Sequence, residues 1–416
     1  MAAPPILAPQ AAQPVLPTTK NRIHTLDALR GFAVLGILLA NIMAFGEPIL
    51  AEMLRIDRWI LTPAEQWLEA WHHLLVSGKF RGALCIMFGV GLWLQFRKRE
   101  AAGAWPNSFL KRMGLLALLG AMHGLFLWFG DVLFVYGVAG FIAALMMRID
   151  ETKMIKVAAW LIVIGSVMGF LTMLGGSVPP DQARQFSQQV PAITIAGETQ
   201  LYAQGSYLWQ LAMRAALWFL NLFNLPILLP TLIGLFLVGV TLARKGVLSD
   251  PGAHPKIMQV GSLVGIFGVL GSSIPLIMQA TGTGDPSLFG MVVDMSFAQF
   301  AAIGYVLWAS WLFHKLSPGG WLRGLENVGR IALTTYLSQT VICTFLFYSY
   351  GLGWFGSLDR FQLLQVVAGV WAWNLIFAAV WLKFFDIGPV EWAWRSAVEG
   401  RKLPWRTRGS ESDAAA

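Results

Sequence analysis

Long apolar runs dominate this sequence and decide what it can fold into. Only 12% of its 416 residues are charged, whereas 56% are hydrophobic. A soluble domain is about 25% charged, so these few charges cannot cover the surface of soluble domains. Ten apolar stretches approach the ~20 residues that a helix needs to cross a bilayer: 26–46, 78–96, 112–130, 132–148, 156–175, 225–243, 257–280, 289–313, 331–350 and 362–383. We therefore predict an all-α fold, a polytopic membrane bundle of about ten transmembrane helices.

The same composition excludes other classes of protein. Disorder requires low hydrophobicity, which this chain lacks. A disulfide-built fold is excluded because there are only two cysteines, Cys85 and Cys343, and both lie inside apolar runs. We interpret them as small core hydrophobes. A net charge of +8 on a soluble protein would suggest nucleic acid as a partner, but here the lipid bilayer explains where the charges lie, so no nucleic-acid partner is expected.

Lysine and arginine predict which way the bundle faces, because cytoplasmic loops are enriched in both. If the ten spans alternate, one set of loops holds only seven of the 30 Lys and Arg residues: Arg55, Arg58, Lys79, Arg81, Arg184, Arg214 and Arg360. The other set is then cytoplasmic, and it includes both termini. Segment 207–222 predicts a further amphipathic helix along the outer interface, or a short re-entrant piece, whose role the sequence does not define.

The ends of the chain differ from its middle. Residues 1–20 are rich in Ala and Pro and carry a single charge. They lack the charged start and apolar core of a signal peptide, so we expect a disordered cytoplasmic tail. Residues 21–395 are expected to form a single transmembrane domain that ends in an interfacial amphipathic helix over 386–395. Residues 396–416 are expected to form a basic cytoplasmic tail.

Charged groups inside a membrane cost several kcal/mol unless they are paired or hydrated, so each is a candidate for function. The uninterrupted apolar run of the first span, Phe32 to Phe45, is about 21 Å long and too short for the hydrocarbon core. The helix must therefore include Asp27 and Arg30. Arg30 and Asn41 are almost three turns apart and share one face. Either Arg30 reaches the inner headgroups and pairs with Asp27 while Asn41 bonds a neighbouring helix, or Arg30 and Asn41 line a polar cavity where Arg30 holds an anionic group.

His123 is the only histidine inside a predicted span, and Asp131 follows at the outer end of that span. An imidazole can accept or donate a proton near neutral pH. In one hypothesis His123 hydrogen-bonds a neighbouring helix and Asp131 caps the fourth helix. In the other, His123 is a general base with Asp131 nearby. On one continuous helix they would lie about 12 Å apart, so contact requires a bend at Gly130 or an approach between the third and fourth helices.

Lys79 opens the second span on its outer side. Its side chain either reaches the outer headgroups or belongs to a basic patch at the outer mouth of a cavity, and Lys79 and Asp27 are the candidate substrate-binding residues. The adjacent His72 and His73 suggest a metal, but no third ligand follows at a suitable spacing, so no metal site is expected. No phosphate-binding loop, nucleophile elbow, HExxH or CxxC motif occurs. Soluble hydrolase and nucleotide-hydrolase functions therefore have no support.

Several short motifs resemble those of one family. They are Leu26–Gly31 with Asn41, Gly78–Phe80 with Phe88–Gly91, Arg112 with His123–Gly124 and Gly130–Leu133, Gly329–Gln339, Ile342–Cys343 with Leu346–Tyr348, and Gly388–Arg395. On these residues the chain resembles the YeiB-like family of uncharacterised bacterial inner-membrane proteins, from Thr25 to Arg395. The resemblance implies a multi-pass protein of the bacterial inner (plasma) membrane.

That family in turn resembles the transmembrane acyltransferases, which include acyltransferase family 3 and heparan-alpha-glucosaminide N-acetyltransferase. The wider resemblance implies about ten helices that pass an acyl group across the membrane to a sugar or another acceptor. Acyltransferase family 3 has an Arg, ten residues and then a His in its first span. Arg30 matches this Arg, but position 41 is Asn. His123 is then the only substitute for the base inside a predicted span.

Three functions remain open. A membrane acyltransferase would bind a cytoplasmic donor such as acyl-CoA through Arg30 and Asn41, and would use His123 and Asp131 as catalytic residues. Its acceptor at the outer face would be a small molecule, a glycan or a lipid, and no bound cofactor is expected. A transporter or lipid flippase would use the same polar residues as substrate and proton sites. A non-catalytic membrane assembly protein would use them for packing. The oligomeric state is not defined by the sequence.

Overall fold

The computed structural model describes residues 24–48, 61–103, 105–175, 185, 188–190, 193–283, 290, 292–294, 296–316 and 320–406, and in these ranges all regular structure is helical. The first helices are α1 (His24–Gly46), α3 (Pro63–Leu75), α4 (Lys79–Ala101), α5 (Asn107–Phe126), α6 (Leu133–Leu145) and α7 (Glu151–Gly175). The middle of the chain forms α9 (Ile195–Gln204), α10 (Tyr207–Phe223), α11 (Leu225–Lys245), the 3₁₀ turn η2 (Pro251–Ala253), α12 (Pro255–Ser272) and α13 (Ile274–Thr281). The last helices are α15 (Ala298–Leu316), α16 (Arg323–Arg330), α17 (Ala332–Phe347), α18 (Arg360–Phe384) and α19 (Pro389–Glu399).

Seven helical segments of the described chain are long and apolar enough to cross a membrane. They are α1, the α3–α4 pair, α5, α7, α11, the α12–α13 pair and α18. An eighth span results if α16 and α17, which meet at an angle of 87°, are counted together. The helical membrane fold predicted from the sequence is confirmed, whereas the count of ten and the cytoplasmic placement of both termini stay predictions.

Each of the ten predicted stretches overlaps a described helix, and two of them fall short for different reasons. Helix α6 has 13 residues, which is about 20 Å of helix and less than the hydrocarbon core. Helix α15 has 19 residues, but it carries Gln299 at its start and His314 and Lys315 in its last turn. These polar residues lower its mean hydropathy below that of a typical span.

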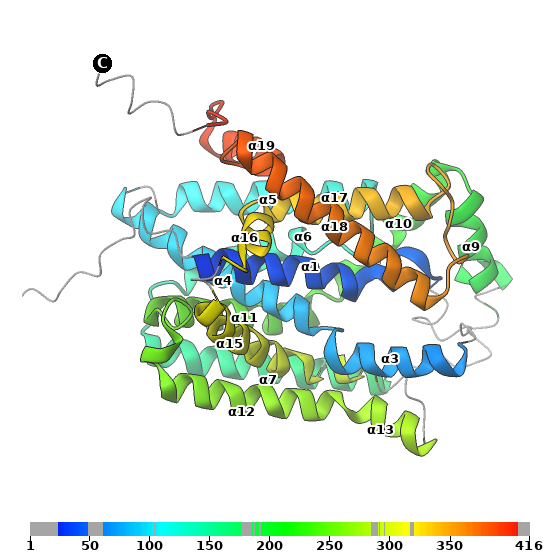
Figure 1. Cartoon of the computed structure of the whole chain (residues 1–416), viewed down its shortest axis with the longest axis horizontal. Helices are drawn as coiled ribbons and strands as arrows, with labels where there is room; N and C mark the ends of the chain where they lie inside the picture. Colours follow the sequence, from blue (N-terminus) through cyan, green and yellow to red (C-terminus); the bar gives the residue numbers. More distant parts are fainter. Residues whose placement is uncertain are drawn as a thin grey trace, which may run out of the picture.

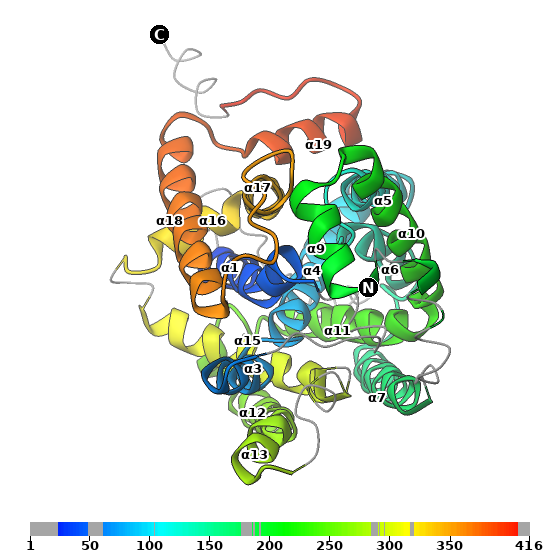
Figure 2. The ribbon, with the colours of Figure 1, turned by 90° about the vertical axis from the view of Figure 1, so that its right-hand side faces the viewer.

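Most of the long helices run along one common axis, with α1 and α4 in the middle of the bundle (Figures 1 and 2). Helix α7 and the α12–α13 pair lie at its periphery (Figure 2). The central pair, α4 and α11, approaches closely because each helix places a glycine at the contact. A Cβ at Gly89 would collide with the carbonyl of Phe236, and a Cβ at Gly239 would collide with the carbonyl of Ile86. Such small residues are what allows helices to pack tightly in a membrane.

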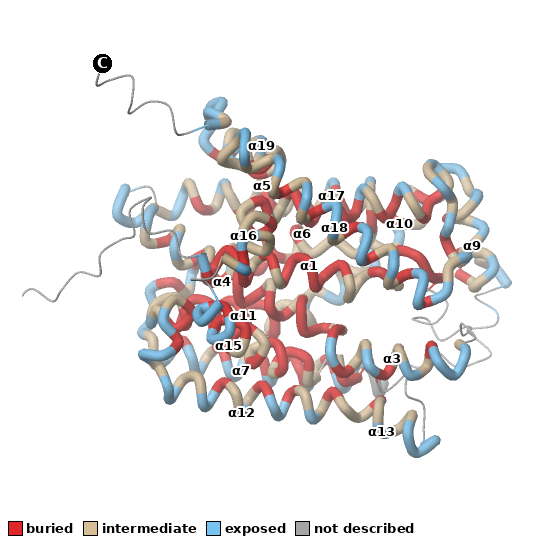
Figure 3. The backbone as a smooth tube through the Cα atoms, viewed as in Figure 1, coloured by how far each residue is buried: buried red, intermediate tan, exposed pale blue. Residues whose placement is uncertain are grey.

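Figure 3 separates a buried centre from an exposed periphery. The outer helices expose large apolar side chains, among them Trp160 of α7 (68% exposed), Leu263 of α12 (61%) and Ile376 of α18 (62%). A soluble monomer rarely exposes extended apolar surface of this kind, whereas helices that face lipid require it. The burial pattern therefore supports a membrane protein independently of hydropathy.

Helix α19, predicted as an interfacial helix, is tied to the bundle by a carboxylate. Glu391 is buried and accepts hydrogen bonds from the backbone N–H groups of Leu333 (2.7 Å) and Thr334 (3.1 Å) in the first turn of α17. A carboxylate at this place satisfies free N–H groups and interacts favourably with the helix dipole. The motifs 329–339 and 388–395, which carry part of the family resemblance, are thus in direct contact.

The chain folds back after α19. This helix runs to Glu399, so the domain boundary predicted at residue 395 falls inside it. Trp405 then stacks on Trp392 with ring centroids 4.2 Å apart. Residues 401–406 of the predicted basic tail therefore pack on the membrane domain. Residues 407–416 of that tail and the predicted N-terminal tail lie outside the described residues.

Candidate functional site

The two candidate catalytic residues are in direct contact. Nδ1 of His123 lies 2.9 Å from Oδ1 of Asp131, and Nε2 of His123 lies 3.0 Å from Oγ1 of Thr340 on α17. His123 is 2% exposed and Thr340 is 1% exposed. Contact across the third and fourth helices, one of the two geometries that the sequence allowed, is possible because α5 ends at Phe126. The connection to α6, residues 127–132, then brings Asp131 back to the imidazole.

A tryptophan shapes this connection. Trp128 is buried and stacks on Phe45 of α1 with ring centroids 4.1 Å apart. Its indole N–H donates to the carbonyl of Ala44 at 3.4 Å. Gly130 lies against the indole so closely that a Cβ there would collide with the ring. The turn that positions Asp131 is therefore held by α1 as well as by α5 and α6.

Asp131 serves the imidazole and the start of α6 at the same time. Its Oδ2 accepts a hydrogen bond from the backbone N–H of Phe134 at 2.7 Å. This bond satisfies one of the free N–H groups at the start of a helix. The capping and pairing hypotheses for Asp131 are therefore compatible.

The hydrogen bonds define which nitrogen of His123 is basic. An ionised carboxylate only accepts hydrogen bonds, so Nδ1 of His123 must donate to Asp131. Nε2 then accepts the hydrogen of the Thr340 hydroxyl. This tautomer, assigned from the hydrogen-bond network, directs the basic nitrogen toward a hydroxyl group.

The first span places its polar residues differently. Arg30 donates from Nη1 to Oδ1 of Asp27 at 3.3 Å, and its side chain is 31% exposed. Asn41 is half-buried, and within the described chain its amide has no hydrogen-bond partner. No hydrogen bond of the described chain joins Arg30 or Asn41 to His123. The pairing of Arg30 with Asp27 is confirmed, whereas the bond expected from Asn41 to a neighbouring helix is not seen.

Several arginines converge at the end of the bundle that holds α16 and α19 (Figure 1). The guanidinium of Arg112 lies over the Trp394 ring, 3.7 Å from its centroid. It interacts electrostatically with the like charges of Arg395, Arg99 and Arg30 and with the opposite charge of Glu399. The positive-inside rule predicts that this cationic end faces the cytoplasm.

Lys79 does not reach the outer headgroups and does not form an exposed patch. It is 0% exposed, and its ammonium group donates to the carbonyl of His73. His73 in turn lies 3.1 Å from Oδ2 of Asp294 through Nδ1, and Ser77 donates to the same oxygen at 2.5 Å. In the part of the chain that the structure describes, no cluster of three or more His, Cys, Asp or Glu residues suits a metal ion.

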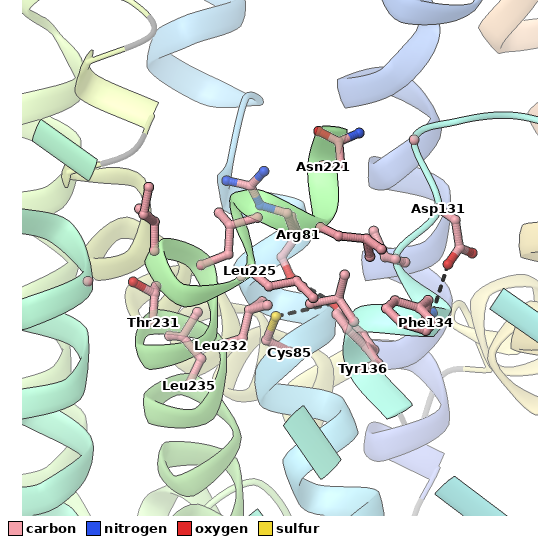
Figure 4. Close-up of a pocket in the computed structure, with 18 of the residues that line it drawn as sticks. Arg81, Cys85, Asp131, Phe134, Tyr136, Asn221, Leu225, Thr231, Leu232 and Leu235 are labelled. Atoms are coloured by element: carbon pink, nitrogen blue, oxygen red, sulfur yellow. Dashed lines mark hydrogen bonds between the residues drawn. The ribbon is translucent and has the colours of Figure 1, made fainter. Parts of the chain in front are cut away.

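A cavity of about 200 Å³ lies between α4, α6, α10 and α11 (Figure 4). Asp131 is one of its lining residues, but His123 is not. The Tyr136 hydroxyl lies 3.2 Å from Sγ of Cys85 and donates to the carbonyl of Arg81 at 3.3 Å. Only the Asp131 half of the His123–Asp131 pair therefore borders this cavity.

The sequence did not single out two residues of the site and the cavity, Thr340 and Arg81. Thr340 is one of six polar residues in α17: Thr334, Thr335, Ser338, Gln339, Thr340 and Thr344. This number of polar residues in one membrane helix was the available signal for polar contacts inside the bundle. Arg81 was counted in the charge pattern of the outer loops, but nothing in its local sequence distinguished it from Lys79.

Comparison with known proteins identifies relatives over almost the whole chain. The family model described as protein of unknown function (DUF418) matches residues 242–401. The uncharacterized protein YeiB of Escherichia coli (strain K12) is 32% identical over 401 residues, which cover 90% of this chain and 96% of that protein. The uncharacterized protein YxaH of Bacillus subtilis (strain 168) is 28% identical over 403 residues, which cover 93% of this chain and 96% of that protein. No solved structure matches the chain.

These relatives confirm the family that the sequence motifs predicted, and their descriptions name no reaction. YeiB and this chain match along nearly their full lengths, so they share the whole membrane domain and not a single motif. The likeness to the transmembrane acyltransferases has no counterpart among these relatives and stays a prediction from the sequence. The chain belongs to the YeiB family.

Proposed function

We propose that this protein is a membrane-embedded acyltransferase that passes an acyl group from a cytoplasmic donor to an acceptor at the outer face. The observation that carries the proposal is the line formed by the Thr340 hydroxyl, the His123 imidazole and the Asp131 carboxylate, with contacts of 3.0 and 2.9 Å. The same order of hydroxyl, imidazole and carboxylate activates hydroxyl groups for acyl transfer in enzymes of unrelated folds.

The chemistry follows from the assigned tautomer. Nε2 of His123 accepts the proton of the acceptor hydroxyl while that oxygen bonds to the acyl carbonyl carbon, and the proton then passes to the departing thiolate of the donor. Asp131 remains ionised and stabilises the imidazolium. The His123 and Asp131 side chains are 1% and 0% exposed, so water screens their attraction only weakly. The Thr340 hydroxyl marks the position that the acceptor hydroxyl takes on Nε2.

The donor is held at the arginine-rich end of the bundle. Acyl-CoA carries several phosphate charges, and guanidinium groups bind phosphate through two parallel hydrogen bonds. Arg30 contributes such a group, oriented by its contact with Asp27, and Arg112 lies in the same electrostatic field. Asn41 lies three turns further along α1 and supplies an amide that can donate to a developing oxyanion. Lys79, a candidate substrate-binding residue, has no part in this proposal because its ammonium is committed to a backbone carbonyl.

The test uses the full chain in lipid nanodiscs with acetyl-CoA and measures the release of free thiol. Substitution His123→Gln is expected to lower the rate about 100-fold or more, as loss of a general base does. His314→Gln is the matched control, because His314 is an exposed histidine at the end of α15. Equal rates in the wild type and the His123→Gln protein would refute acyl transfer by this residue.

One observation favours a second candidate, a proton-coupled transporter. Both ring nitrogens of His123 are engaged, and His123 does not line the cavity that Asp131 borders. A buried pair of ionisable residues behind the wall of a cavity is typical of proton relays in transporters. The same assay separates the two functions, since a transporter would release no thiol at all and would instead accumulate a solute in proteoliposomes under a pH gradient.

A further inference from the structure

The cavity between α4, α6, α10 and α11 contains two polar side chains that the protein itself does not satisfy. Arg81 of α4 and Asn221 of α10 both line it. Within the described chain, neither the Arg81 guanidinium nor the Asn221 amide has a hydrogen bond or an ion pair. Figure 4 shows both side chains at the same end of the cavity. Arg81 and Asn221 are both half-buried, and a guanidinium that lines a cavity in a membrane protein without an anion marks a candidate site for an anionic ligand.

The remaining wall of the cavity is mainly apolar. Helix α11 contributes a row of leucines, spaced by three or four residues and therefore on one face of the helix: Leu225, Leu228, Leu232 and Leu235. Trp218 of α10 closes another side. A ligand that fills this space needs an apolar part as well as an anionic one.

The charges around the cavity favour a ligand with one negative charge. Arg81 is the cation of the lining, and Asp131 is its carboxylate. Both carboxylate oxygens of Asp131 are already bonded, to His123 and to the N–H of Phe134. The Asp131 side chain is also 0% exposed, so Arg81 is the charged group that a ligand in the cavity can reach. A phosphate group carries about −1.5 to −2 charges near neutrality, which a single guanidinium would leave partly uncompensated.

We propose that this cavity binds a short-chain alkyl carboxylate. The carboxylate accepts two hydrogen bonds from Arg81, the geometry that guanidinium and carboxylate prefer, and Asn221 donates a further one. The alkyl chain packs on the leucine row of α11. The cavity volume of about 200 Å³ favours a chain of a few carbons over a long one. The proposal concerns binding alone, so it does not depend on the acyl-transfer proposal.

The experiment is calorimetric titration of the detergent-solubilised full chain with four probes: butyrate, 1-butanol, inorganic phosphate and decanoate. Butyrate is expected to bind at least about tenfold more tightly than each of the other three. Arg81→Gln should weaken butyrate binding at least about tenfold, because a charge-assisted pair is lost. The control Arg148→Gln removes an arginine whose side chain is 72% exposed, and it should bind butyrate as the wild type does.

A second variant keeps the test decisive if Arg81→Gln fails to fold. Leu232→Phe fills the apolar part of the cavity without changing its charge, so it should weaken butyrate binding. Its control is Leu171→Phe, at an exposed position on α7. The proposal is overturned if the wild type binds no carboxylate, if Leu232→Phe binds butyrate normally, or if phosphate binds more tightly than butyrate. Equal binding of decanoate would also overturn it, because a long chain fits lipid and not this cavity.

Discussion

Substitution of His123 by alanine is expected to destabilise the protein strongly, whatever its catalytic role. The imidazole is 2% exposed and bridges Asp131 and Thr340. Its loss leaves a carboxylate with a side-chain exposure of 0% without its main partner, which costs about 3–5 kcal/mol in other buried pairs. It also leaves the Thr340 hydroxyl unpaired, at about 1–3 kcal/mol. Because these terms overlap, we expect a total loss of about 4 kcal/mol.

The measurement is equilibrium unfolding of the purified protein in mixed micelles, with two matched variants. Thr340→Val removes one hydrogen bond and should cost about 1 kcal/mol. His314→Ala removes an exposed histidine and should change the stability by less than about 0.5 kcal/mol. A loss below about 1 kcal/mol for His123→Ala would refute the reasoning, since it would mean that water or another group satisfies Asp131 when the imidazole is absent.

Three further outcomes follow from the packing. Arg360 binds both carboxylate oxygens of the buried Glu47, at 3.1 and 3.2 Å, so Arg360→Met should lower the free energy of unfolding by about 3–5 kcal/mol in the same unfolding assay. Gly239→Ala should reduce folded yield and thermal stability, because its methyl group would collide with a backbone carbonyl of α4. The hydrogen bond from Arg99 lowers the pKa of Glu399 below its usual 4.5. This contact therefore stabilises α19 above that pH and is lost as the pH falls further. Hydrogen exchange of residues 389–406 should then accelerate, and the Glu399→Gln variant should lack this acid-dependent step.

Hydropathy was sufficient to predict the long apolar helices of this fold but not the shorter helices α3, α9 and α16 between them. Each predicted stretch overlaps a helix, because about 20 apolar residues have few alternatives in a membrane. The 87° bend between α16 and α17 falls at Ile331, where the predicted stretch 331–350 begins, and α16 lies before that stretch. Glu391 contacts the start of α17 at this bend, and hydropathy cannot reveal a contact between groups that are 58 residues apart in the sequence.

In the candidate site, too, the sequence predicted which residues matter but not how they come into contact. Sequence position singled out His123 and Asp131, because ionisable groups at membrane depth are few. Their contact depends on a turn held by Trp128 against α1, which a helical periodicity cannot reveal. Thr340 is 217 residues from His123, and its hydroxyl is an ordinary feature of a membrane helix until the fold brings the two together.

Lys79 illustrates how a general rule fails locally. A lysine at the outer end of a span usually extends toward the headgroups. Here the backbone turns before α4, and the carbonyl of His73 accepts the ammonium inside the protein, close to the carboxylate of Asp294. Local acceptors of this kind can only be found once the neighbouring helices are placed.

The most direct test of the proposed acyl transfer is a sided assay in proteoliposomes. Acetyl-CoA with a labelled acetyl group is supplied on the side that holds α19, and both the free thiol on that side and the label on the opposite side are measured. We expect thiol release with label transfer in the wild type, loss of both in His123→Gln, and retention of both in His314→Gln. Thiol release no greater than that of protein-free vesicles, in either orientation of the protein, would contradict the proposal.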